Sequence, residues 1–374
     1  MSSLLATSHA TASTDGKRTP MHGRLQSFRR RAMAWLVRKA FPDADNLVSP
    51  GQLPRSGMQR ILVCRPNHRL GNTLMMTPLL AELEARFPGA EVDLLASGGA
   101  ARSVFAGFPS VGELFLLDRR ALRHPLATLR TLGRLRAKRY DLVIDAASGS
   151  TSGRMAAHLA RARFQLRVEG SPDAPAHFAA RPVHALREAL GVNGGEWPVL
   201  DLRLSAPERA KGAETLLRVL KAGHTSAAPV LAIFPNATGA KCQDATWWRC
   251  FLAALLERIG DYRIVELVAA DGLSRLDNVY PTYFTSDPRK LAAFIEAAGL
   301  YISADCGVMH LAAATQATTV GLFSRTDPQR YSPYGAGNAG ITCDEAGPEQ
   351  TARQVAIRVA ASRIASQAGS IGTM

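Results

Sequence analysis

Short apolar runs alternate with segments of helical spacing along most of the chain. Residues 61–66 (ILVCRP) form the first run, a glycine-containing loop follows, and residues 73–87 repeat apolar positions at helical intervals. Buried parallel strands separated by helices produce this alternation. Residues 59–205 are therefore predicted to form a doubly wound, Rossmann-like α/β domain. Its predicted strands are residues 61–66, 88–96, 113–117 and 140–146.

The alternation returns after a connection rich in Gly, Pro and Asn around residues 186–205. Residues 206–345 are predicted to form a second doubly wound domain. Residues 346–374 are predicted to form a final helix, at 348–365, and a frayed end. The second domain's predicted strands are residues 229–235, 263–269, 300–305 and 318–323, and its predicted helices are residues 207–221, 247–259, 288–298 and 308–316.

The N-terminal residues differ from both halves. Residues 1–20 are rich in Ser, Thr and Ala without periodicity, which is typical of a disordered tail. Residues 21–58 are predicted to hold a basic amphipathic helix, at 24–41, and a linker. A basic helix packed on the protein or on a partner is the alternative to a membrane-surface helix. The apolar face of the helix would carry Leu25, Phe28, Ala32, Trp35 and Leu36.

Positive charge is concentrated in two segments. The chain has 45 Lys and Arg against 31 Asp and Glu, a formal net charge of +14. Residues 1–58 hold nine Lys or Arg and three Asp, and residues 119–139 hold eight Lys or Arg and no acidic residue. Such charge attracts nucleic acid, anionic lipid or phosphorylated sugars. Nucleic acid is disfavoured because no basic motif is interleaved with aromatic residues.

Three features bear on the compartment. No apolar run reaches the ~18 to 20 residues of a spanning helix, and the N-terminus lacks a signal-peptide pattern. The five cysteines are odd in number and contain no C-x-x-C pair, so reduced thiols are expected rather than disulfides or a zinc site. We therefore expect an unexported, cytoplasmic protein.

Ligands of open α/β sheets bind in loops after the carboxyl ends of strands, and three such loops carry suitable residues. The first is residues 65–73 (RPNHRLGNT). Gly71 allows a ligand to approach the backbone, and Asn72 and Thr73 could cap the next helix. Capping alone is the competing explanation.

The other two loops lie in the second half. Within residues 234–248, Lys241 precedes a helix and could meet an anion, although an ordinary surface lysine is the alternative. Asp305 ends a strand, Gly307 removes a side chain at the turn, and the next helix offers N–H groups suited to a diphosphate. N-capping by Asp305 and a structural His310 are the alternatives.

Taken together, these loops resemble glycosyltransferase family 9, the bacterial lipopolysaccharide heptosyltransferases. The resemblance covers roughly residues 60–335, and its most specific element is D-x-G-x-M-H-L-A-A-A at 305–314, followed by T-V-G-L-F and T-D-P. It implies a GT-B fold, in which two Rossmann-like domains face each other across a cleft. The N-terminal domain would bind the acceptor and the C-terminal domain the nucleotide sugar.

The resemblance also implies roles for individual residues. Lys241 would neutralise the donor phosphates, and Asp271 would bind the nucleotide ribose. The diphosphate would be held at Asp305, Cys306, Gly307 and Val308, with His310 beside it. The acceptor would be bound by Arg69, Gly71, Thr73, Arg123 and Arg130. The family inverts the anomeric centre, uses a first-loop carboxylate as general base and needs no metal or other cofactor, because Lys and helix dipoles meet the leaving-group charge.

The chain departs from the family at two positions. Gly71 is followed by Asn72 where the family usually has G-D, so an amide replaces the expected base. Asp145 and His68, in nearby strand-end loops, are the titratable substitutes. Cys306 stands where the family commonly has Thr or Ser, so a hydroxyl hydrogen bond to phosphate is lost.

The leading hypothesis is a transferase that moves heptose from ADP-heptose, or another sugar, to a lipopolysaccharide inner-core acceptor. The enzyme would attach peripherally to the inner face of the cytoplasmic membrane. The anionic acceptor would explain the basic residues at 119–139; the alternative is a solvated helix face above a buried stripe of Leu122, Leu126, Leu129, Leu132 and Leu135. Asn72 favours the alternative function of a catalytically weakened sugar-nucleotide-binding protein.

Overall fold

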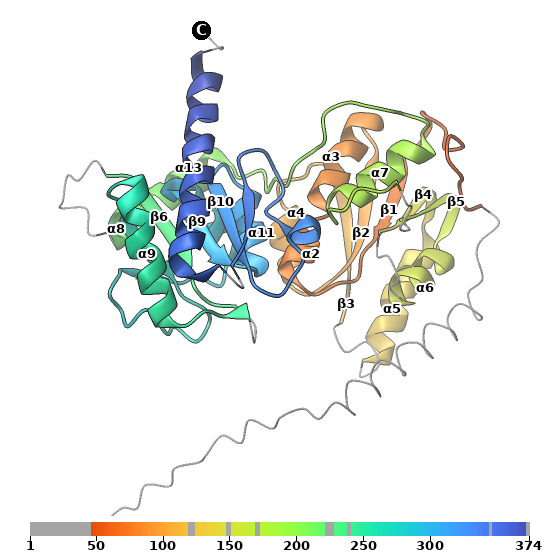
Figure 1. Ribbon diagram of the computed structural model, residues 1–374. Coiled ribbons are helices and arrows are strands. Elements are labelled where there is room, and N and C mark those ends of the chain that lie inside the picture. Colours follow the sequence, from red (N-terminus) through yellow and green to blue (C-terminus); the bar gives the residue numbers. More distant parts are fainter. Residues whose placement is uncertain are drawn as a thin grey trace, which may run out of the picture. The chain divides into compact units, whose positions relative to one another are not determined.

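Two parallel β-sheets organise the protein (Figure 1). The computed structural model describes residues 46–118, 124–146, 151–168, 173–220, 228–237, 241–343 and 346–371. Ala44–Met374 is a compact unit, distinct from Met1–Asp43. The tail predicted at 1–20, the helix predicted at 24–41 and Arg123 lie outside the described residues.

The first sheet has five parallel strands in the order β3-β2-β1-β4-β5. Four are the predicted strands. The fifth strand, β5, was not predicted because its sequence RARFQLR contains no continuous apolar run. Its buried residues lie mainly in its second half. The strands are β1 (Arg60–Cys64), β2 (Glu91–Ser97), β3 (Val111–Leu117), β4 (Arg139–Asp145) and β5 (Arg161–Arg167).

The helices of the first half connect these strands. The helix predicted at 73–87 is divided in two, because Pro78 favours a new helix start in the first turn of α3. The helices are α2 (Leu70–Leu74), α3 (Thr77–Arg86), α4 (Ala100–Phe105), α5 (Pro125–Ala137), α6 (Thr151–Leu159) and α7 (Ala180–Ala189).

The second sheet has six parallel strands in the order β11-β10-β9-β6-β7-β8. The four predicted strands form its centre, and the short strands β8 and β11 lie at its edges. The strands are β6 (Val230–Phe234), β7 (Arg263–Leu267), β8 (Thr282–Tyr283), β9 (Gly299–Ala304), β10 (Thr318–Phe323) and β11 (Ala339–Thr342).

The helices of the second half are α8 (Ala206–Val219), α9 (Ala245–Ile259), α10 (Pro288–Ala298), α11 (Gly307–Ala313), α12 (Pro328–Tyr331) and α13 (Gly347–Ile371). The predicted frayed end at 366–374 is wrong as far as Ile371, because α13 continues to that residue.

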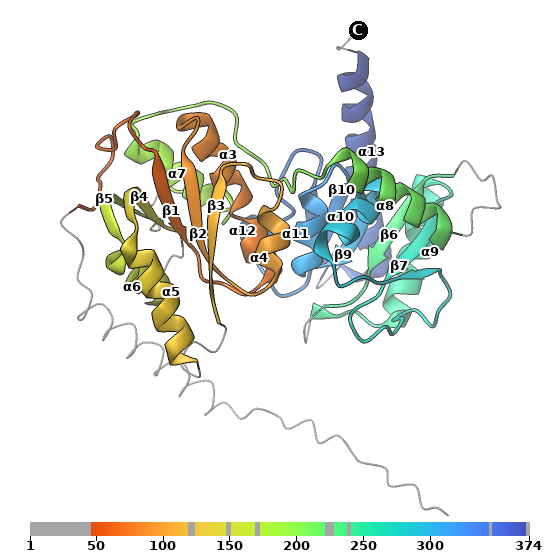
Figure 2. The same cartoon turned by 180° about the vertical axis from the view of Figure 1, so that it is seen from behind.

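Helices cover both faces of the second sheet. The two views show α9 and α13 on one face and α8 and α10 on the other (Figure 1 and Figure 2). In β6, Ile233 packs in a core cluster with Trp248 and Val355, whereas the preceding Ala232 packs in a cluster with Phe294. Alternate residues of a strand point to opposite faces, so one strand supplies both clusters. The predicted doubly wound architecture of two parallel-sheet domains is confirmed.

The residues that precede β1 pack on the first half. Leu53 and Met58 are buried. Val48 donates its N–H to a carbonyl of β5, and Leu53 donates to the carbonyl of Ala189 in α7. The described part of the predicted linker, residues 46–57, is thus held against the first half at Val48 and Leu53.

Arg289 of α10 fastens the end of the connection between the two halves. Its guanidinium donates to the carbonyl oxygens of Ser103, Leu202 and Arg203 and to both carboxylate oxygens of Glu208. This hydrogen bonding lowers the pKa of Glu208 to about 2, so the carboxylate stays charged near neutral pH. Ser103 belongs to α4, so one side chain joins both halves and the connection.

The outward side of α5 is unexpectedly apolar. Leu132 and Leu135 are buried, but Leu126 and Leu129 are 70% and 64% exposed. The predicted buried stripe is therefore wrong for these two leucines, and Leu122 lies outside the described residues. The last turns of α5 pack with β3 and β4, and the first turns do not share that core. No described helix combines the length and apolar character required to cross a bilayer.

Candidate functional site

The carboxyl ends of β1 and β4 lie side by side in the first sheet. Cys64, the last residue of β1, pairs in register with Asp145, the last residue of β4. Arg65 follows and donates from Nη1 to the carbonyl oxygen of Ala146. Burial lowers the pKa of Arg65, and the nearby Tyr331 and Asp145 oppose this effect. The buried Asp145 carboxylate thus lies close to a guanidinium, at the strand end where the sequence predicted it.

The first loop differs in detail from its prediction. Asn72 and Thr73 lie inside α2 and do not cap a helix. Instead, the side chain of Asn67 accepts the backbone N–H of Arg69, at 2.9 Å. The Asn72 side chain is half-buried and makes no hydrogen bond with another described residue, while His68 and Arg69 are exposed. The Asn72 amide is therefore available to a ligand.

The first loop meets the third loop where α2 contacts α11. A Cβ atom added to Gly71 would lie 2.5 Å from Cδ2 of His310. A Cβ atom added to Gly307 would lie 3.4 Å from Cβ of Leu70 and 3.6 Å from the backbone nitrogen of Gly71. Two of the three loops predicted from the sequence are therefore in direct contact, and glycine at 71 is required for this approach.

His310 is buried at the centre of this contact. Its Nδ1 atom has no hydrogen-bond partner among the described residues. Burial lowers the pKa of His310 to about 4; Asp305 opposes the shift, and His177 and Lys241 add to it. The imidazole is therefore neutral near pH 7. A neutral ring can donate one hydrogen bond and accept another.

Lys241 and Asp305 join the second and third loops, which follow the neighbouring strands β6 and β9. The ammonium forms an ion pair with the largely buried carboxylate. The N-cap of α11 is Cys306, not Asp305, and the Cys306 side chain makes no capping hydrogen bond, so the capping alternative for Asp305 is wrong. Burial raises the pKa of Cys306 to about 11, so its thiol adds no negative charge. Lys241 is the cation of this buried cluster.

A pocket of about 610 Å³ opens beside this cluster, at the carboxyl ends of β10 and β11. It begins one residue after Leu322, whose carbonyl accepts the N–H of Asp305. The Ser324 hydroxyl is buried and has no partner among the described residues. The pocket is lined by Phe323, Ser324, Arg325, Thr326, Asp327, Thr342 and Ala346. Its polar side chains could contact a hydroxyl-bearing ligand. No described group of three His, Cys, Asp or Glu side chains has the arrangement of a metal site.

Two predicted binding residues lie apart from the cluster. Asp271 is exposed, pairs with Arg275 at 2.5 Å and accepts the N–H of Leu273 at 3.1 Å. Arg130 is exposed on α5. Neither contacts Lys241 in the described part of the chain. A ligand bound at Lys241 would therefore have to extend beyond the cluster to meet either residue.

Three residues of this region were missed by the sequence prediction. The His177 ring stacks on Tyr334 with centroids 4.6 Å apart, and its Nε2 lies 2.9 Å from the Ser332 carbonyl oxygen. Burial lowers the pKa of His177. Tyr331 lies near Arg65 of the first half. The family-like segment RTDPQRYSPYG contains both tyrosines, but sequence alone does not show that they face the first half.

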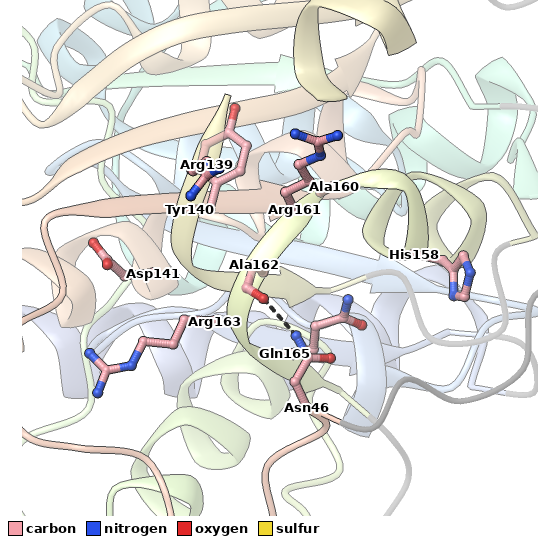
Figure 3. A pocket seen from close by; sticks show the side chains of 10 residues that line it. All are labelled: Asn46, Arg139, Tyr140, Asp141, His158, Ala160, Arg161, Ala162, Arg163 and Gln165. Atoms are coloured by element: carbon pink, nitrogen blue, oxygen red, sulfur yellow. Dashed lines mark hydrogen bonds between the residues drawn. The ribbon is translucent and has the colours of Figure 1, made fainter. Parts of the chain in front are cut away.

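A second pocket, of about 620 Å³, lies at the other edge of the first sheet, where β4 and β5 begin. It is basic, but the side chains of Arg161 and Arg163 point away from each other, and His158 lies on the far side (Figure 3). Arg163 stacks on the ring of Phe164 instead, at 4.9 Å. Because these cations do not converge, we do not include this pocket in the candidate site.

Comparison with known proteins gives a family match in the second half. Residues 287–357 match the model of glycosyltransferase family 9 (heptosyltransferase). This segment contains the third loop, α11 and the T-D-P sequence. A comparison with curated protein sequences finds no match.

Solved structures share the fold over most of the chain. A family 9 glycosyltransferase from Veillonella parvula is 18% identical, with a TM-score of 0.65, and the match covers 81% of this chain and 97% of that one. Escherichia coli heptosyltransferase WaaC with ADP is 18% identical, with a TM-score of 0.62 and coverage of 81% and 100%. Escherichia coli ADP-heptose LPS heptosyltransferase II is 18% identical, with a TM-score of 0.60 and coverage of 83% and 100%.

These structural matches define the fold class as that of the GT-B glycosyltransferases. The predicted resemblance to glycosyltransferase family 9 is confirmed by the family model at residues 287–357 and by the shared fold.

Proposed function

We propose that the protein transfers heptose from ADP-heptose to the inner core of a lipopolysaccharide acceptor. The observation that carries the proposal is the contact between the strand-end loops of the two halves, with Gly71 against His310 and the Lys241–Asp305 pair beside it. A sugar transferase has to bring a donor loop and an acceptor loop to one point. ADP and heptose are named with similar solved structures, which supports the choice of donor.

The donor phosphates would lie at Lys241 and His310. A diphosphate carries more negative charge than Asp305, so it would attract the Lys241 ammonium strongly. His310 is neutral and could donate a hydrogen bond to a phosphate oxygen from its unpartnered side. These groups and the first amides of α11 would stabilise the charge that develops on the leaving diphosphate, so the transfer would need no divalent metal.

The acceptor hydroxyl would be activated in the first half. We assign Asp145 as the general base, because its carboxylate is buried at the strand end next to the first loop. The Asn72 amide, which has no described partner, would orient the attacking hydroxyl. Direct attack on the sugar of a donor held by the second half would invert the anomeric centre. General-base assistance of this kind is typically worth ~10²- to 10⁴-fold in rate.

Asn72 also favours a second candidate function. An amide cannot accept a proton near neutral pH, so the chain could bind a nucleotide sugar without efficient turnover. A family 9 transferase with another donor sugar would have the same donor loops. In each case we propose that the protein works at the inner face of the cytoplasmic membrane, where the basic helix predicted at residues 24–41 would attach it.

Two measurements test the proposed function. A screen of nucleotide sugars by thermal unfolding should select ADP-heptose, because a ligand at 100 times its Kd stabilises the folded state by about 2.7 kcal/mol. Transfer to a lipopolysaccharide core acceptor should then occur equally with and without EDTA and give an inverted anomer by NMR. Binding of ADP-heptose without transfer would favour the binding protein, and selection of another nucleotide sugar would favour the transferase with a different donor.

A further inference from the structure

The outward face of α5 carries an exposed apolar pair. Leu126 and Leu129 are one helical turn apart and are 70% and 64% exposed. Arg130 and Gly133 share this face, because they lie four and seven residues after Leu126. A Cβ atom added to Gly133 would meet no atom within 4 Å. This face is therefore open over about two turns.

The outward face also carries uncompensated positive charge. Arg130 and Arg136 form no ion pair with a described residue, whereas Arg134 and Lys138 are paired with Glu113. The sequence from 119 to 139 contains no acidic residue. Asp118 is the acid before this segment, and its carboxylate lies 3.7 Å from Nε2 of His124. A surface that covers this face should therefore combine apolar groups with negative charge.

The position of the pair relates it to the candidate site. β3 ends at Leu117, at the same edge of the parallel sheet as the ends of β1 and β4. The chain then runs back along α5 to Arg139, the start of β4. The first turns of α5 therefore lie toward the edge that holds Arg65 and Asp145.

We propose that this α5 face docks on an anionic phospholipid bilayer. Leu126 and Leu129 would enter the headgroup boundary, and Arg130 and Arg136 would contact lipid phosphates. Docking would turn the acceptor edge of the first sheet toward the membrane. The inference rests on the proposed function in one respect, namely that the acceptor is carried by a membrane.

Charge complementarity favours lipid over other occupants. The segment at 24–41 is itself strongly basic and would repel Arg130 and Arg136 if it covered them. A second copy of the chain would bring the same positive face. An anionic bilayer offers both the apolar boundary and the opposite charge, and it could bind both basic segments at once.

The test uses the full-length protein and sedimentation with vesicles. Vesicles of phosphatidylglycerol and phosphatidylcholine should bind the wild type, and vesicles of phosphatidylcholine alone should bind it weakly. In Leu126→Asp/Leu129→Asp, binding should fall at least roughly tenfold, because each charge near an anionic surface changes binding about fivefold. Thermal unfolding should not change, since both leucines are exposed.

A matched control lies on the second half. Leu217 of α8 is 54% exposed and stands beside the ion pair of Glu214 and Arg218. Leu217→Asp adds a charge to a similar exposed helix position and should leave vesicle binding unchanged. The proposal would be overturned if Leu217→Asp lost as much vesicle binding as the double variant. It would also be overturned if the double variant sedimented with vesicles as well as the wild type does. A change of oligomeric state in the double variant, with unaltered vesicle binding, would assign the face to a second copy.

Donor binding and transfer to a water-soluble core oligosaccharide separate this proposal from the proposed function. Both should be unchanged in Leu126→Asp/Leu129→Asp if α5 acts only in docking. Loss of vesicle binding with normal soluble transfer supports the docking face. If the wild type binds vesicles through these leucines but transfers no sugar, the docking face stands and the proposed function fails.

Discussion

The substitution Gly71→Ala tests the contact between the two strand-end loops. The added methyl group would lie 2.5 Å from Cδ2 of His310, whereas ordinary contacts of a Cβ atom begin near 3.4 Å. His310 is buried and its backbone carbonyl accepts the N–H of Ala314, so the ring or α2 has to move by about 1 Å. Overpacking of this kind typically costs about 1–3 kcal/mol.

The assay is a double-mutant cycle with Gly71→Ala, His310→Ala and the double variant, measured by chemical unfolding and by calorimetry of donor binding. His310→Ala removes the ring, so Gly71→Ala should cost little in that background. The difference between the two costs should be about 1–3 kcal/mol. Donor affinity should fall in Gly71→Ala, because the displaced ring belongs to the proposed phosphate site.

Gly133→Ala is the control for the general effect of replacing a glycine. Its Cβ would meet no neighbouring atom, and it lies inside α5, so alanine should stabilise the protein by up to about 1 kcal/mol. If Gly71→Ala is also neutral or stabilising, or if its cost is the same with and without the His310 ring, the two loops do not meet as described.

Three further predictions concern charge and proton transfer. Lys241→Ala should weaken donor binding by about 1.5–3 kcal/mol in calorimetry, while Lys241→Arg should retain most of the affinity. Asp145→Asn should lower turnover at least roughly tenfold with little change in donor affinity, whereas Asn72→Asp should preserve or raise turnover. Unchanged turnover in Asp145→Asn would show that Asp145 is not the general base. Because the pKa of His310 is about 4 in the folded protein, below its usual 6.5, the unfolded chain binds the extra proton between these values. The free energy of unfolding should therefore fall as the pH drops through this window, by up to about 3 kcal/mol, and a pH titration of His310→Asn should lack this fall.

The strands and the strand-end loops could be predicted because their signals are local. An apolar run bounded by polar residues marks β1, β6 or β9 directly. β5 has no such run, since its first half alternates between exposed and partly buried residues. The leucine spacing in α5 correctly indicated a helix, but burial of each leucine depends on which neighbour lies beneath it.

The candidate site was predictable in its parts and not in its contacts. Asp145, Lys241 and Asp305 could be selected because Asp145 ends a strand and the other two lie in loops that follow strands. The approach of Gly71 to His310 joins residues that are far apart in the sequence, as does the stacking of His177 on Tyr334. Such contacts depend on how the two halves pack, which periodicity does not encode.

The guanidinium of Arg289 limits how the two halves can separate. All five of its N–H groups are used, and they hold α4, the connection and α8 together. A swinging motion at this joint would have to break several of these hydrogen bonds at once, and lysine could not replace them because its donors radiate from one nitrogen. The end of the connection at Leu202 and Arg203 is therefore held rigidly and does not act as a hinge.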